Sequence, residues 1–204
     1  MSLRAELIGS MANGDPDFAV LLPPGWEATS PEFSSPRDRV SAAVATLPLH
    51  AQGAARARMA ELLDTARAEA ERADVIRIFA PTASSEKDVV PVSLVAAWLN
   101  APVGSTAAQL GSELIERHGA SPLDPTGAIL TWHIDTTAQI ESSTVRISGA
   151  GYLLRAPGLT HKALLFRSTI FGGLDSTKIS DEGVAAMGRL CDAIVASVRW
   201  RKRA

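Results

Sequence analysis

Apolar residues recur along the chain at two spacings, one typical of strands and one typical of helices. Phe18, Val20 and Leu22 share one parity and are followed by Pro23-Pro24-Gly25, a combination that predicts a short strand ended by a turn. Three further apolar runs end at a proline or shortly before one, and we expect them to be strands as well: residues 40–47, 75–80 and 89–99.

Three segments place apolar residues three and four positions apart, which is the period of an α-helix. Residues 52–73 carry a narrow apolar stripe, and residues 106–118 carry another that ends before Gly119. The last helix is expected from about residue 180 to 200, with Ser180 as its cap and two carboxylates in its first turn. Its apolar stripe comprises Val184, Met187, Cys191, Ile194, Val195 and Val198.

Three late strands are predicted between the second and the last helix. In the first of them Thr131, His133 and Asp135 share a face that we interpret as solvent-exposed. The second strand changes its apolar parity across Gly149-Ala150-Gly151, and a bulge there would return its apolar residues to one face. Pro157-Gly158 then predicts a hairpin that leads into the third strand.

The resulting order of elements is β-β-α-β-β-α-β-β-β-α. Because the late hairpin requires antiparallel pairing, this order favours the α+β class, with a mostly antiparallel sheet, helices packed on one face and the C-terminal helix closing the core. The length of 204 residues suits a single domain over 1–204, in which residues 1–17 are expected to be flexible.

Composition and charge narrow the classes of function. Apolar residues make up 46% and charged residues 21% of the chain, which is ordinary for a globular protein. A formal net charge of −2 disfavours a nucleic-acid partner, and no apolar run is long enough to span a membrane. With a single cysteine and no signal-peptide pattern, we expect a cytoplasmic location.

The residues that could carry chemistry do not form a catalytic constellation. Cys191 lies at the centre of the last apolar stripe, so we expect it to be buried and inert rather than nucleophilic. His133 and Asp135 share a strand face and could act as a base and its orienting group, although an outward strand face is also where such residues belong. We therefore assign no catalytic, metal-binding or cofactor-binding residues and expect no cofactor.

Both ends of the chain resemble a known family. Phe18-Ala19-Val20-Leu21-Leu22-Pro23-Pro24-Gly25-Trp26 is similar to the opening strand of the PsbP-like fold family, and residues 192–200 resemble its closing helix. The chain is also similar to a group of uncharacterised actinobacterial proteins. The resemblance implies an antiparallel sheet with helices packed against it, and relatives that mostly bind or assemble with other proteins.

Three functions remain as hypotheses. The leading one is a non-enzymatic protein-binding or assembly accessory, adaptor-like or chaperone-like, whose partner is another protein. The second is a small-molecule carrier in which Trp26, Trp98 and Trp132 line an apolar pocket. The third is a hydrolase using His133 and Asp135. Homo-oligomerisation is an open expectation, because a sheet of this kind has edges to cover.

Overall fold

The computed structural model describes residues 4–8, 15–30, 68–82, 91–140, 143–171 and 179–201, together with positions 53, 57, 64 and 65. The strand expected at residues 40–47 lies outside the described residues, as does most of the helix expected at 52–73. The described positions 53, 57, 64, 65 and 68–72 of that helix are helical.

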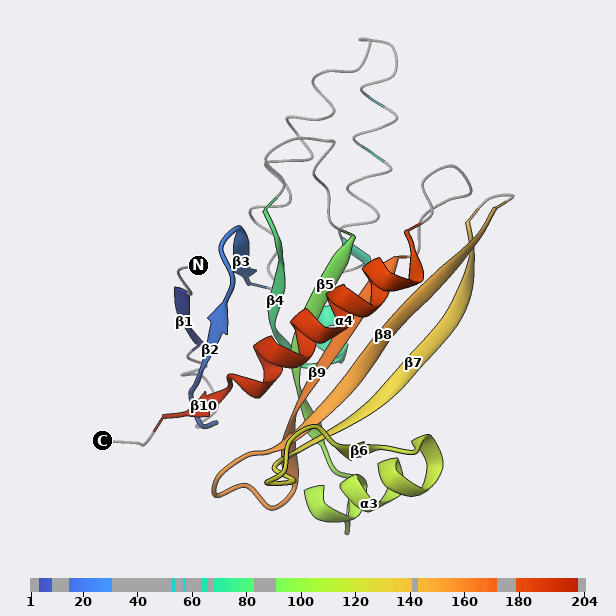
Figure 1. The fold of residues 1–204 in the computed structure, drawn as a ribbon. Coiled ribbons are helices and arrows are strands. Elements are labelled where there is room, and N and C mark those ends of the chain that lie inside the picture. The colour runs from blue at the N-terminus through green and yellow to red at the C-terminus, as the bar shows by residue number, and fades with distance from the viewer. Residues whose placement is uncertain are drawn as a thin grey trace.

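A seven-stranded antiparallel sheet forms the centre of the molecule (Figure 1). Its strands, in spatial order, are β3 (Trp26–Thr29), β4 (Val75–Pro81), β5 (Val92–Asn100), β9 (Lys162–Phe171), β8 (Ser143–Arg155), β7 (Ile129–Ile140) and β6 (Ser121–Pro122). Every neighbouring pair is antiparallel. The α+β class and the mostly antiparallel sheet predicted from the sequence are therefore confirmed.

A second, three-stranded sheet stands beside the first and joins the two ends of the described chain. It consists of β1 (Arg4–Ile8), β2 (Phe18–Leu22) and β10 (Arg199–Trp200), with β2 in the middle. β1 lies within the segment that the sequence led us to expect as flexible. The strands β1, β3, β6 and β10 were not predicted, and the last three have only two to four residues, too few to show a period.

The C-terminal helix α4 (Asp181–Ala196) begins as predicted, with the Ser180 side chain accepting a hydrogen bond from the Gly183 amide. It ends at Ala196, earlier than expected, because the following residues turn into β10 and pair with β2. The Trp200 ring consequently lies on the Trp98 ring, with centroids 6.3 Å apart. The helix closes the core, since Cys191, Ile194 and Val195 are almost fully buried against the sheet.

The other helix with full bounds, α3 (Ala107–His118), packs on the face of the sheet opposite α4. Successive residues of β8 show this, because Leu154 belongs to the core beneath α4 whereas Leu153 packs with Ala107 of α3. The sequence led us to expect the helices on one face of the sheet, whereas α4 covers one face and α3 covers the other. The physical reason is that the central strands are apolar on both faces, so each face needs a cover.

The pairing of β7 with β8 is continuous from Ile129–Leu154 to Ile140–Ser143, so the bulge predicted at residues 149–151 is absent. Gly149 has a different role there: a Cβ atom would overlap the Ser168 carbonyl oxygen of β9, so only glycine permits this close approach. Unbroken register also fixes the parity of β8. Arg146 and Ser148 lie opposite Thr137 and Asp135, on the face that carries α4.

Candidate functional site: the groove between α4 and the β7–β8 hairpin

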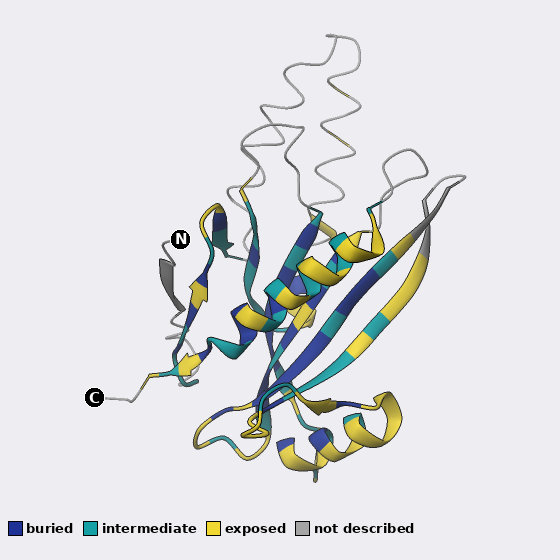
Figure 2. Cartoon of the chain, in the orientation of Figure 1, coloured by how far each residue is buried: buried dark blue, intermediate teal, exposed yellow. Residues whose placement is uncertain are grey.

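Helix α4 crosses the sheet diagonally and packs against β9, β8 and β2, while the β7 side of the sheet extends beyond it (Figures 1 and 2). A groove of about 740 Å³ lies between the helix and the β7–β8 hairpin. This volume falls in the range of ligand sites in proteins. Its walls include both polar and apolar side chains: Thr131, His133, Arg146, Ser148, Ala150, Tyr152, Ile170, Asp181, Val184, Ala185, Arg189 and Asp192.

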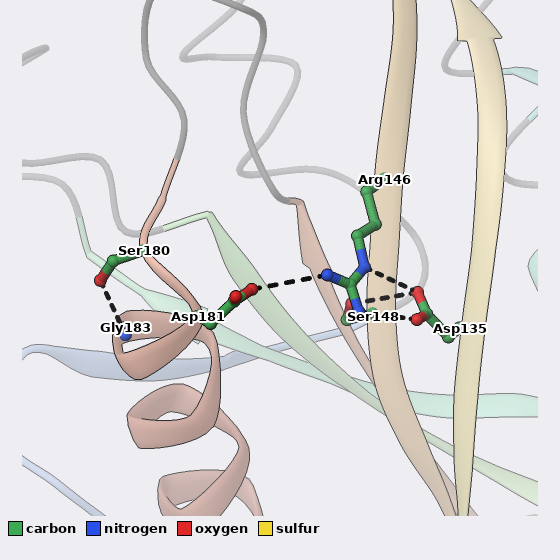
Figure 3. Close-up of polar contacts among 6 residues, drawn as sticks. All are labelled: Asp135, Arg146, Ser148, Ser180, Asp181 and Gly183. Atoms are coloured by element: carbon green, nitrogen blue, oxygen red, sulfur yellow. Dashed lines mark hydrogen bonds and ion pairs between the residues drawn. The ribbon is translucent and has the colours of Figure 1, made fainter.

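The two walls of the groove are bridged by Arg146 of β8 (Figure 3). Its Nε and Nη2 atoms donate to the two carboxylate oxygens of Asp135, at 3.0 and 2.7 Å. Its Nη1 atom lies 3.5 Å from a carboxylate oxygen of Asp181, in the first turn of α4. The Ser148 hydroxyl also donates to Asp135, at 3.3 Å. We name these four residues the Arg146 cluster.

The electrostatics of the Arg146 cluster follow from this paired geometry. The hydrogen bond from Arg146 is the main cause that lowers the pKa of Asp135, and the same bond raises the pKa of Arg146. The side chains are 56% exposed for Arg146 and 40% for Asp135, so solvent screens their attraction. The bidentate bond nevertheless fixes the orientation of the guanidinium plane at the rim of the groove.

The hydrolase hypothesis required Asp135 to orient His133, and no hydrogen bond between their side chains occurs in the described structure. The Asp135 oxygens instead accept from Arg146 and Ser148. Both residues are exposed, as predicted, yet they stand on the α4 side of the sheet, where His133 lines the groove. Sequence reasoning missed Arg146, because the predicted bulge obscured which face it occupies.

The floor of the groove includes a buried tyrosine that is hydrogen-bonded to a carboxylate. Tyr152 of β8 is fully buried, and its hydroxyl donates to Asp192 Oδ1 of α4 at 2.7 Å. Burial is the largest cause that raises the pKa of Tyr152, and the nearby Asp192 carboxylate raises it further. The phenol therefore stays protonated and acts as a hydrogen-bond donor that ties α4 to the sheet.

Cys191 follows the sequence prediction closely. It is free and fully buried, and burial raises the pKa of its thiol to about 12, with the Asp192 carboxylate as a further cause. Since the thiolate is the nucleophile, the folded protein is expected to resist iodoacetamide at pH 8 and to be alkylated after unfolding in guanidinium. Mass spectrometry measures both states; stoichiometric alkylation of the native protein within minutes would contradict the prediction.

The three tryptophans of the carrier hypothesis do not line a common pocket. Trp26 and Trp98 belong to the core beneath α4, whereas Trp132 packs with the α3 side of the sheet. There its ring occupies the space that a side chain at Gly151 would need. The prediction of a common pocket is wrong because the indoles, although apolar, are divided between two faces of one sheet.

Comparisons with known proteins do not assign a family. No protein-family model matches the chain, and no curated protein matches its sequence. Among solved structures, the chain is similar to a protein described as LpqN, involved in cell envelope biogenesis of Mycobacterium tuberculosis. The identity is 8% and the TM-score 0.46, covering 99% of this chain and 93% of that one. The PsbP-like resemblance thus stays a resemblance.

None of the described helices is long and apolar enough to cross a membrane. Among the residues with described side chains, no three histidine, cysteine, aspartate or glutamate residues are grouped so that they could hold a metal ion.

Proposed function

We propose that the protein is a non-enzymatic protein-binding accessory that holds a segment of a partner protein in the groove between α4 and the β7–β8 hairpin. The observation that carries this proposal is the groove itself, a concave surface of about 740 Å³ bounded by α4 and by the β7–β8 hairpin. Concave surfaces with these boundaries are common recognition sites.

The chemistry of the groove suits a polypeptide segment. Its apolar lining, from Ala150, Ile170 and Val184, can cover apolar side chains of a bound segment. Its rim presents donors and acceptors of both signs, including Arg189 and Asp181. Asp135 already pairs with Arg146 and Asp192 with Tyr152, so a bound segment would cover these carboxylates without leaving them unpaired.

A pair of neighbouring alanines on α4 gives a matched test. Ala185 lines the groove, whereas Ala186 is exposed outside it, so Ala185→Trp fills the site and Ala186→Trp controls for the bulk of the new side chain. Peptides selected on the wild-type protein from a random display library are expected to bind the Ala185→Trp variant at least about tenfold more weakly. Their affinity for the Ala186→Trp variant is expected to stay near that for the wild type.

Nuclear magnetic resonance with a selected peptide locates the site directly. Chemical-shift changes are expected at Ala150, Val184 and Ala185 rather than on α3. If the library yields no binder, or if binders tolerate Ala185→Trp as well as Ala186→Trp, the groove is not a peptide site.

The volume of the groove also favours a second candidate, the binding of a small molecule, since about 740 Å³ accommodates a drug-sized ligand. This version of the carrier hypothesis no longer depends on the three tryptophans. A fragment screen by nuclear magnetic resonance separates the two candidates: fragments that shift Ala185 signals, together with an empty peptide selection, would favour the small molecule.

A further inference from the structure

The outer edge of β7 is open along most of its length (Figure 1). The two-residue strand β6 pairs only with Leu130 and Thr131, and beyond them no described strand pairs with this edge. Residues 133 and 135–137 are exposed. An edge strand presents unpaired N–H and C=O groups, which make it a template for another strand.

The open edge also lacks the devices that usually protect such strands. Residues 132–140 contain no proline and no lysine. Their one carboxylate, Asp135, is neutralised by the bidentate bond from Arg146 within the same hairpin. Proteins that must stay monomeric commonly place lysine, proline or an unpaired charge at such positions.

We propose that this edge pairs with the same edge of a second copy of the chain, antiparallel, around a two-fold axis at Thr136. Residues 132–140 run from the end of the β6 pairing to the end of β7, and Thr136 is their midpoint. A two-fold axis at that residue therefore pairs the whole open edge, while the second copy ends before it meets β6.

The sequence of the edge is self-complementary in this register. In this register Trp132 and Ile134 pair with positions 140 and 138 of the second copy, where the sequence has Ile and Ala. On the α4 side, Asp135 stands opposite Thr137, so no like charges meet across the junction. A two-fold axis at Asp135 would instead bring two carboxylates together. This apolar-to-apolar and polar-to-polar match is the argument for a second copy rather than an unrelated strand.

The pairing joins the two grooves. A two-fold axis perpendicular to the sheet keeps both α4 helices on the same side, so the joined β7 strands become the floor of one trough between two helical walls. The dimer does not depend on what the groove binds, and its test is separate from the peptide test.

Charge substitutions at Thr136 test the two-fold axis itself, because only there does a side chain meet its own counterpart. Sedimentation equilibrium of the wild-type protein is expected to give twice the chain mass of 21.5 kDa. Thr136→Asp and Thr136→Lys are each expected to weaken the dimer by about tenfold or more, through like-charge repulsion. An equimolar mixture of the two variants is expected to recover the dimer.

Charge substitutions on α3, away from the β7 edge, serve as controls. Ser112→Asp and Ser112→Lys, on the exposed face of α3, are expected to leave the mass unchanged, and circular dichroism checks the folding of every variant. A weak dimer is still expected to form at a protein concentration of about 100 µM. A wild-type protein that remains monomeric at that concentration overturns the proposal. So does a dimer that persists in both Thr136 variants, or a mixture that fails to recover it.

Discussion

Replacing Gly149 by alanine is expected to destabilise the fold by roughly 3 kcal/mol, at the upper end of the usual cost of overpacking. The new Cβ atom would overlap the Ser168 carbonyl oxygen, and a backbone atom cannot turn aside as a flexible side chain can. Separating β8 from β9 to make room would also stretch the bond between the Ala150 amide and Ser168 Oγ, now 2.8 Å. Urea denaturation followed by tryptophan fluorescence measures the change.

Gly188→Ala is the matched control for this experiment. Gly188 lies within α4, and a Cβ atom there would meet nothing within 4 Å. Alanine is the better helix former, so this variant is expected to be more stable by up to about 1 kcal/mol. Equal effects of the two substitutions, or a loss of less than about 1 kcal/mol in Gly149→Ala, would mean that the two strands are not in such close contact.

Lys162→Met is expected to cost about 3 kcal/mol, because it removes one partner of a buried ion pair. The Lys162 ammonium lies 2.7 Å from the Asp15 carboxylate, and their side chains are only 18% and 8% exposed. A second carboxylate, that of Asp74, is 3.6 Å away, and the Trp98 ring lies beneath the ammonium at 5.1 Å. Methionine keeps most of the apolar stem but leaves Asp15 as an uncompensated charge.

The double variant Lys162→Met with Asp15→Leu is the informative control. Because it removes both charges and replaces them by apolar groups, it is expected to recover much of the stability that the single variant loses. Urea unfolding of the wild type, both single variants and the double variant completes the cycle. If Lys162→Met costs no more than a surface substitution, below about 0.5 kcal/mol, the ion pair is solvated and this account is wrong.

The elements that the sequence predicted well are those whose signals are local. The C-terminal helix combined a cap, acidic residues in its first turn and an apolar stripe, and α4 begins where these signals place it. The strand from Phe18 to Leu22 and the buried Cys191 follow from equally local patterns. Periodicity can also predict which residues are buried, because it identifies one face of an element.

The candidate site depended instead on which faces of separate elements meet. The parity change along β8 suggested a bulge, whereas the strand keeps its register and is apolar on both faces, because α3 covers the second one. That error concealed Arg146, whose partners Asp135 and Asp181 lie on a different strand and on a helix. The bond between Tyr152 and Asp192 likewise joins elements far apart in the chain, and no local pattern reports it.

The pairing of β2 with β10 has a consequence for how the protein is made. Phe18 pairs with Trp200, and their rings meet edge to face at 5.8 Å, so residues near both ends of the chain contribute to one core. During synthesis the pairing of β2 with β10 cannot form until the segment that carries Trp200 has left the ribosome. Contacts of such long sequence separation slow folding and expose nascent chains to aggregation. We therefore expect the newly synthesised chain to need chaperones that bind exposed apolar strands.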